Sequence, residues 1–287
     1  VKSVKSVGSV PTLGTAIPAD DITAWTTNTP TTISYTARSI PNVTAAGTAS
    51  YSNGILTIKG EGTIQGNDSN VVIENLGEDI VTIVGGEIKG YEGISVEKGT
   101  VKVLGGIIDT TNSAIYNKAE GKIEALDGTV KSENVAIYNN STGSVEISGV
   151  GNVIGATGVY DNGDGNIIVA ERAQVTGTSE NGIYSETGSV TILGGNVTGN
   201  TNGIYMDGDG SVTIGANNGI VSTRIPVITA TSTTSGSGYA VNVAEQTEFN
   251  YYDGKLIGRE NSSIKGIVDD IPVPDYEIIK ANADGKE

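Results

Sequence analysis

Apolar and polar residues alternate in short stretches that recur through most of the chain. In Val190-Thr191-Ile192, for example, two β-branched apolar residues flank one polar residue. Alternation with a period of two predicts a β-strand whose flanking residues face the interior. Comparable stretches begin at Leu56, Val81, Val101, Ile123, Val145, Ile167, Val190, Val212 and Phe249. The sequence therefore predicts nine repeating units, each opening on a strand of this kind.

A glycine that stands two positions before most of these strands sets the length of the repeat. It occurs at Gly99, Gly121, Gly143, Gly165, Gly188 and Gly210, in steps of 22, 22, 22, 23 and 22 residues. A fixed period in this range is typical of solenoid proteins. Ankyrin repeats would need helices rich in Ala, Leu and Glu, and leucine-rich repeats would need a leucine pattern. Val, Ile and Thr predominate instead, which favours strands.

Each unit contains two further strands. The second is very short, and its inward residue is aliphatic at Ile88, Ile108, Val130, Val153, Val175, Val197 and Val221. The third runs from a small residue through a β-branched one to tyrosine, as in Ala136-Ile137-Tyr138. We expect the β-branched residue to face the core and its two neighbours to point outward. Three strands and three turns per unit predict an all-β, single-stranded, right-handed parallel β-helix of nine coils, capped at both ends.

The ends of the chain and one of the coils depart from the repeat. The expected organisation is a flexible linker at 1–18, an N-terminal cap at 19–53, the β-helix at 54–270 and a closing segment at 271–287. About 15 residues more than usual separate Ile204 from Val241, which predicts a lateral insertion at about 222–238. An open solenoid end exposes apolar interior and strand edges. We therefore expect Trp25 to cover the N-terminal end, with contact to a sugar as the alternative.

Charge and composition narrow the classes of function. The net charge of −16 argues against binding to nucleic acid or to an anionic membrane surface. No run reaches the roughly 18 apolar residues of a membrane span. The chain has no histidine and no cysteine, which excludes Ser-His-Asp and Cys-His catalysis and the usual zinc sites. The absence of cysteine fits either a reducing compartment or an extracellular protein, and the excess of Thr, Ser, Asn and Gly favours the second, a protein that is secreted or attached to the cell surface. Because it begins at Val1 without a signal peptide, we expect a mature or trimmed form.

The recurring tyrosines are the first candidates for ligand binding. They are Tyr116, Tyr138, Tyr160, Tyr184 and Tyr205, and stacked coils would place them in one file at the spacing of neighbouring strands. Two interpretations are open. The rings stack on each other as a structural ladder, or they offer a flat aromatic face to sugar rings. Under the second interpretation all five are glycan-contact residues.

Acidic residues in the turns after the tyrosines are candidate calcium ligands. The set is Asp161, Asp164, Glu186, Asp207 and Asp209. Stacked coils would align these carboxylates about 5 Å apart along one edge, and calcium takes about six to eight oxygen ligands. The alternative is that Asp and Gly are the residues that turns require. No other cofactor is expected.

Two further groups of polar residues are weaker candidates for ligand binding or catalysis. Asn117, Asn139 and Asp161 directly follow their tyrosines and are expected to form a structural polar ladder. The pairs Asp20-Asp21 and Asp269-Asp270 are poor glycosidase candidates, because adjacent residues of a strand face opposite ways.

Several segments together indicate a family. The runs GGNVTGNTNGIYMDGDGSVTIGANNG, SAIYNKAEGKIEALDGTV and VAIYNNSTGSVEISG resemble pectate-lyase-like parallel β-helix proteins, and more narrowly the repetitive surface proteins of Gram-positive and gut bacteria. FNYYDGKLIGRENSSIKGIV is similar to a recurring element of those surface proteins. The resemblance covers about Leu56 to Asp270 and implies the fold. It implies no single activity, because this architecture hosts lyases, hydrolases, epimerases, tailspikes and adhesins.

The expected function is a non-catalytic extracellular module of a bacterial surface protein, a stalk or adhesin-like element whose partner is a polysaccharide or a host glycan. The alternative is a calcium-assisted polysaccharide lyase or another carbohydrate-active enzyme. A lyase would gather a basic residue and several carboxylates in one groove, whereas Arg172 and Arg224 stand at no matched position beside a carboxylate cluster. A phage tailspike segment is a third option, and it would need trimer-forming surfaces.

Overall fold

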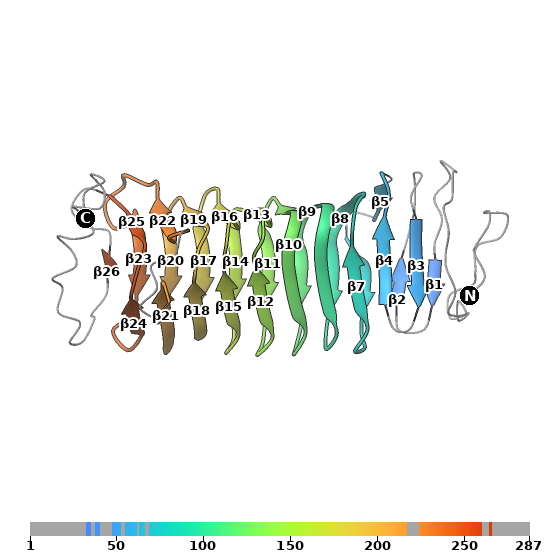
Figure 1. Cartoon of the computed structure of the whole chain (residues 1–287), viewed down its shortest axis with the longest axis horizontal. Coiled ribbons are helices and arrows are strands. Elements are labelled where there is room, and N and C mark those ends of the chain that lie inside the picture. The colour runs from blue at the N-terminus through green and yellow to red at the C-terminus, as the bar shows by residue number, and fades with distance from the viewer. Residues whose placement is uncertain are drawn as a thin grey trace.

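The computed structural model describes residues 33–35, 38–40, 48–52, 55–61, 63–66, 69–216, 224–259 and 264–265. Within these ranges every regular element is a β-strand, and the strands from Ile55 onward stack in parallel into an elongated solenoid. Figure 1 shows the strands of successive coils side by side along the long axis. The architecture is consistent with the pectate-lyase-like parallel β-helix expected from the sequence.

Three walls of parallel strands form the solenoid. The first wall contains β4 (Ile55–Lys59), β7 (Ile80–Ile83), the starts of β9 (Thr100–Asn117) and β10 (Lys122–Ser132), β12 (Ser144–Ile147), β15 (Asn166–Val169), β18 (Gly188–Ile192), β21 (Gly210–Ile214) and β24 (Glu248–Tyr251). The second wall contains β5 (Thr63–Gln65), the start of β8 (Glu87–Val96), the middle of β9, the end of β10, β13 (Asn152–Gly155), β16 (Gln174–Gly177), β19 (Asn196–Gly199), β22 (Val227–Ala230) and β25 (Lys255–Ile257).

The third wall carries the tyrosines. It contains β6 (Val71–Asn75), the ends of β8 and β9, β11 (Val135–Asn139), β14 (Thr157–Asp161), β17 (Asn181–Ser185), β20 (Asn202–Met206), β23 (Tyr239–Val243) and β26 (Ile264–Lys265). The stack has about seven turns with a spacing of about 22 residues, slightly fewer than the nine coils expected. Each wall contains nine strands among the described residues, but the regular spacing holds only for the seven first-wall strands from β7 to β21, because the coils that begin at β4 and β21 have longer connections.

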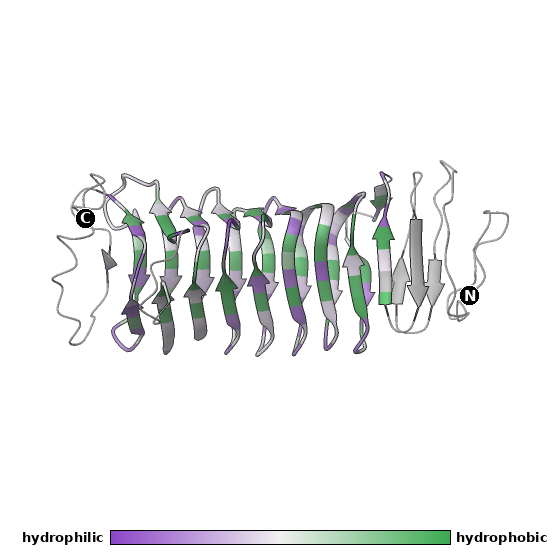
Figure 2. Ribbon diagram, in the orientation of Figure 1, coloured by the Kyte–Doolittle hydropathy of each residue, from purple (hydrophilic) through white to green (hydrophobic). Residues whose placement is uncertain are grey.

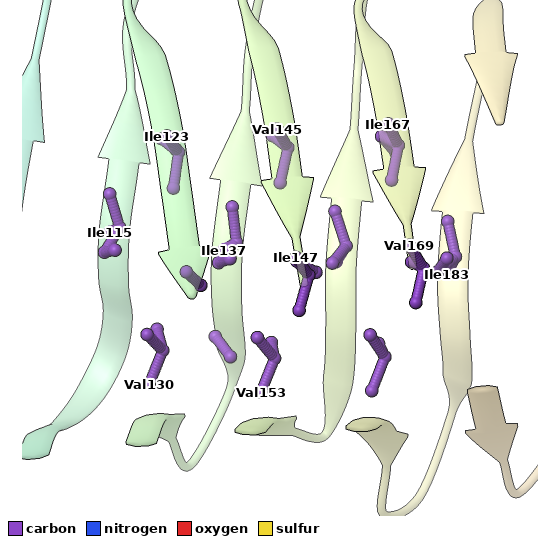
Figure 3. Packing of buried hydrophobic residues seen from close by; sticks show 14 of the residues in the cluster. Ile115, Ile123, Val130, Ile137, Val145, Ile147, Val153, Ile167, Val169 and Ile183 are labelled. Carbon is purple, nitrogen blue, oxygen red and sulfur yellow. The ribbon is translucent and has the colours of Figure 1, made fainter. Parts of the chain in front are cut away.

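The core is a thin column of aliphatic side chains. Figure 3 shows Ile123 and Val145 from the first wall, Val153 from the second, and Ile115 and Ile137 from the third, pointing into one interior. All five are at most 1% exposed. Burial of such a side chain stabilises a fold by about 1.5–3 kcal/mol. Figure 2 shows the corresponding alternation of apolar and polar residues along the strands.

The N-terminal end of the first wall is closed by an antiparallel strand. β3 (Thr48–Ser52) pairs with β4 with Thr48 opposite Lys59 and Ser52 opposite Ile55. β1 (Ile33–Tyr35) and β2 (Arg38–Ile40) form a separate antiparallel pair. Trp25 and residues 271–287 lie outside the described residues.

The small residues that precede the β-branched column face inward, which corrects the sequence expectation. Ala114, Ala136 and Ala240 are fully buried. A Cβ added at Gly158 would lie 2.8 Å from Val175 Cγ1 of the second wall, and one at Gly182 would lie 2.8 Å from Val197 Cγ1. This column is small because the third wall bends against the second at this corner. It therefore does not flank the tyrosine rings on the outer surface.

A strand interrupts the segment expected to be a lateral loop at about 222–238. β22 lies within it and pairs with β19, with Ile228 opposite Val197 and fully buried. The inward residue that pairs with Val197 in this coil is therefore Ile228, and Val221, which the sequence predicts for this column, lies outside the described residues. The additional chain is divided between the connections before and after β22. Ile228 satisfies the same requirement as its neighbours, because the interior of each coil needs an aliphatic residue from this wall.

Buried amides at the corner between the third and first walls explain the repeating glycine. Asn117 Nδ2 donates to Gly121 O at 2.6 Å and to Asn139 Oδ1 of the next coil at 2.7 Å. Asn139 Nδ2 repeats this pattern toward Gly143 O at 3.0 Å and Asp161 Oδ1 at 2.7 Å. Each amide therefore binds the corner glycine of its own coil and the polar side chain of the next.

These glycines have no room for a side chain. A Cβ at Gly143 would overlap Asn117 Nδ2 and lie 2.5 Å from Gly121 O. A Cβ at Gly165 would overlap Asn139 Nδ2 and lie 2.6 Å from Asp161 Oδ1. The 22-residue period is therefore a packing requirement, because the amide file and the glycine file occupy the same corner.

We expect Gly143→Ala to lower the free energy of unfolding by about 2–3 kcal/mol, because the new methyl group overpacks this corner. Thermal and urea unfolding followed by circular dichroism measures the loss. Gly236→Ala is the control, since a Cβ there meets nothing within 4 Å. Its φ of 85° should still cost about 1 kcal/mol. Equal losses in the two variants would contradict the packing explanation.

Candidate functional site

The five tyrosines form one continuous file on the outer side of the third wall. Tyr116, Tyr138, Tyr160, Tyr184 and Tyr205 are paired in register across β9, β11, β14, β17 and β20. Each side chain is half-buried, with the β-branched residue before it fully buried. The period-two alternation of the strand explains this arrangement, because an inward Ile or Val directs the next residue outward.

The rings stack in the middle of the file and turn at its ends. The ring centroids of Tyr138 and Tyr160 are 5.1 Å apart, with an angle of 5° between the ring planes. Those of Tyr160 and Tyr184 are 4.6 Å apart, with an angle of 15° between the planes. Tyr116 is turned 79° from Tyr138, and Tyr205 is turned 82° from Tyr184. Tyr160 therefore has a neighbouring ring on each face. A sugar could therefore touch only the edge and the hydroxyl of the Tyr160 ring. The rings at the two ends of the file, Tyr116 and Tyr205, do not stack face to face with another tyrosine.

Acidic side chains of the following turns hold the tyrosine hydroxyls. Tyr160 Oη donates to Glu186 Oε1 at 3.3 Å, and both Tyr184 Oη and Tyr205 Oη donate to Asp207, at 3.2 and 2.5 Å. The hydrogen bond with Asp207, together with burial, raises the pKa of Tyr205 to about 12. Burial, then the charge of Asp207, raises the pKa of Tyr184 as well. Two of the five candidate calcium ligands are thus partners of the tyrosine file.

The candidate calcium ligands do not form one cluster. Asp161 is fully buried, whereas Asp164, Asp207 and Asp209 are exposed and Glu186 is half-buried. Among the residues that the structure describes, no three acidic side chains are grouped closely enough to hold a metal ion. The pairs Asp20-Asp21 and Asp269-Asp270 lie outside the described residues. The sequence expected a row of turn carboxylates, but the strand alternation directs Asp161 inward and so separates it from the others.

Asp161 takes the place of an amide in the buried polar file. Its Oδ1 accepts from Asn139 Nδ2 at 2.7 Å, and its Oδ2 lies 3.1 Å from Ser185 Oγ. Ser185 Oγ is also within hydrogen-bonding distance of Thr187 O. A hydroxyl has one proton, so Ser185 cannot donate to both. A protonated Asp161 resolves this, because it donates to Ser185, which then donates to Thr187.

The environment of Asp161 favours that protonated form. Burial raises the pKa of Asp161 to about 7, even though its hydrogen-bonding contacts with Asn139, Ser185 and the Gly163 backbone act to lower it. The polar ladder expected at Asn117, Asn139 and Asp161 is thus present, and it lies inside the corner.

A shallow pocket that the sequence did not reveal lies beside the first two rings of the file. Its volume is about 230 Å³, and its lining includes Tyr116, Tyr138, Glu92, Asn112 and Asn134. Asn112 Nδ2 donates to Glu92 Oε1 at 3.0 Å, and Asn134 Nδ2 donates to Asn112 Oδ1 at 3.3 Å. One feature of the sequence could have indicated this pocket, because Asn112 and Asn134 stand 22 residues apart at the start of the third strand of their coils. The pocket also requires Glu92, which pairs with Ser113 of the next coil and stands directly before Gly93.

A separate group of charged side chains on the first wall forms ion pairs among its own members. Glu124 is 8% exposed and lies 2.7 Å from Lys102 Nζ and 2.5 Å from Lys122 Nζ. Burial alone would raise the pKa of Glu124, but the two lysines outweigh it and lower that pKa. Lys122 Nζ also lies 3.8 Å from Glu146 Oε2. These contacts join three neighbouring coils, so we interpret the group as a structural ion network.

Comparison with protein-family models, curated proteins and solved structures finds no match for this chain. The part of the chain that the structure describes contains no helix long and apolar enough to cross a membrane.

We expect Asp161→Asn to stabilise the protein above pH 7. A folded-state pKa near 7, above the ordinary 3.8, means that the folded form binds the extra proton. The wild-type protein therefore has the full contribution of this group below about pH 4 and loses it as the pH rises to 7. Asparagine keeps the acceptor for Asn139 and donates to Ser185 at any pH. The difference in free energy of unfolding should grow by roughly 1 kcal/mol per pH unit between pH 5 and 7.

Denaturant unfolding at pH 5, 6, 7 and 8 measures this difference. Asp164→Asn is the control, because it removes the same charge from an exposed turn in the same coil. The interpretation of Asp161 is wrong if the two variants show the same pH dependence, or if Asp161→Asn is destabilising at pH 8.

Proposed function

We propose that this chain is a non-catalytic extracellular module of a bacterial surface protein, a stalk or adhesin-like element that displays its third wall to a polysaccharide or host glycan. The tyrosine file is the observation that carries the proposal. It places five half-buried aromatic rings and the carboxylates of Glu186 and Asp207 in one strip on the outer surface. Four steps of strand spacing make the strip about 20 Å long.

The rigidity of this strip supports a role in binding. Ring stacking and the hydroxyl contacts to Glu186 and Asp207 hold the tyrosines in place before any ligand arrives. Tyrosine offers a large amphipathic contact area with little conformational entropy to lose. A fixed row of such side chains reduces the ordering cost of association with an extended ligand.

The end of the file at Tyr116 is the favoured contact point. Tyr160 has neighbouring rings on both faces, whereas Tyr116 is turned 79° from Tyr138 and borders the pocket. Sugar-binding sites combine an apolar ring face with a few placed polar groups. Glu92, Asn112 and Asn134 supply such groups beside Tyr116.

The direction of the backbone hydrogen bonds supports a stalk. They join each coil to the next along the long axis, as in Ala170 N to Ile147 O at 2.9 Å and Asn196 N to Ala173 O at 2.9 Å. Tension along the axis is therefore spread over the bonds of three walls. The cysteine-free composition, rich in Thr, Ser, Asn and Gly, supports the extracellular setting.

We expect the protein to bind a subset of glycans on a glycan array, and Tyr116→Ala to weaken that binding by about fivefold or more, since an aromatic contact contributes roughly 1 kcal/mol. Tyr160→Ala should have a smaller direct effect because its ring faces are already occupied. Titration calorimetry on the strongest array ligand measures both.

Tyr252→Ala is the matched control, since Tyr252 is 45% exposed and lies outside the file. Repeating the array with a calcium chelator tests for a metal requirement. Absence of any bound glycan would contradict the binding role. Release of unsaturated products from a polysaccharide would overturn the non-catalytic role and support a lyase instead.

A further inference from the structure

We propose that the pocket formed by Tyr116, Tyr138 and Glu92 is a subsite for a sugar residue that carries a free ammonium group. The proposal rests on the glycan-binding function above and adds a chemical class of ligand. It is carried by three properties of the pocket, which are its charge, the direction of its hydrogen bonds and its aromatic walls.

Glu92 gives the pocket a negative charge. It is the only ionisable carboxylate or ammonium group among the residues that line the pocket, and it is half-buried. The chain as a whole has a net charge of −16. Both the local carboxylate and the overall field favour a cationic ligand and disfavour a uronic acid.

The hydrogen bonds within the pocket leave acceptors for a ligand. Asn134 donates to Asn112, and Asn112 donates to Glu92 Oε1. This chain directs amide donors toward the carboxylate and fixes its orientation. A carboxylate accepts several hydrogen bonds, so Glu92 retains capacity for an incoming donor. An ammonium group supplies three N–H donors and a charge, and charge-assisted hydrogen bonds are about twice as strong as neutral ones.

The aromatic walls also suit a cation. The Tyr116 and Tyr138 rings meet at 79° with their centroids 5.1 Å apart, so the pocket is bordered by rings in two orientations. Lys118 Nζ lies 6.0 Å from the Tyr116 ring centroid and 3.8 Å from Glu74 Oε1, so this cation is already paired with a carboxylate and is not part of the pocket lining. A ligand cation within about 6 Å of a tyrosine face is attracted by the ring.

The size of the pocket limits the ligand to one sugar ring at a time. About 230 Å³ is below the roughly 300–1,000 Å³ of pockets that enclose drug-sized molecules. The rest of an oligosaccharide would extend along the third wall over the tyrosine file.

The test compares three oligosaccharides of equal length by titration calorimetry at physiological ionic strength. They are a glucosamine oligomer, its N-acetylated counterpart and a galacturonic acid oligomer. We expect the wild-type protein to bind the glucosamine oligomer about tenfold or more tightly than the N-acetylated one, and the galacturonic acid oligomer least of all. A uronic acid preference, or equal affinity for the amine and its acetylated form, would overturn the proposal.

Two variants separate the pocket from the overall charge of the protein. Glu92→Gln keeps an acceptor for Asn112 and should reduce affinity for the glucosamine oligomer about tenfold. Asp209→Asn removes one negative charge from an exposed turn at the other end of the file and should change it less than about twofold. If both variants lose the same amount of affinity, the preference comes from the overall charge of the protein, and the proposed subsite is wrong. Unchanged melting temperatures confirm that both variants are folded.

The outcomes distinguish this proposal from the one on which it rests. If Tyr116→Ala weakens the binding of neutral glycans while Glu92→Gln changes no preference, the third wall binds glycans and the ammonium subsite is wrong. If the wild-type protein binds none of the array glycans and none of the three oligomers, both proposals are wrong.

Discussion

The packing of a buried amide against a glycine is the constraint on which the rest of this structure depends. At the corner between the third and first walls, Asn117 and Asn139 each bind their own coil and the next one. The glycine beside them has no space for a methyl group. A polar file of this kind has to be fully satisfied, since an unpaired buried amide costs more than the bond contributes. The file therefore fixes the spacing and the register of the coils from Asn117 to Ser185, and apolar residues such as Val96 and Met206 take the same position on either side.

Register in the interior determines what the surface presents. Because each coil repeats the same inward positions, the residues between them also align, and five tyrosines become one strip. The same alignment limits how much ring surface the strip can offer to a ligand, since stacked rings cover each other's faces. Tyr160 is structural on both faces, whereas Tyr116 borders a pocket with Glu92. The candidate site is therefore concentrated where the repetition ends and a different side chain, Ser95, takes the tyrosine position.

The sequence was sufficient to predict what depends on periodicity. The strands of the first wall, the inward column at Ile115 and Ile137, and the pairing of Ile204 with Val241 follow from alternation and repeat length. The predictions from the sequence were wrong at the corners between walls, where the chain bends and the simple alternation of inward and outward residues no longer holds. The small column at Ala114 and Ala136 is buried, and Asp161 points inward although its turn-like sequence indicated the surface. The pocket at Glu92 joins residues from three coils at such a corner, so no local pattern identifies it.

The antiparallel pairing of β3 with β4 has a consequence for how this molecule meets copies of itself. A parallel solenoid with a bare terminal strand is a template on which another chain can extend the ladder. β3 runs in the opposite direction and occupies the hydrogen-bonding groups along that side of β4, from Lys59 to Ile55. Parallel strand addition directly onto β4 is thereby blocked, and a further strand on the first wall at this terminus would have to pair with β3 instead.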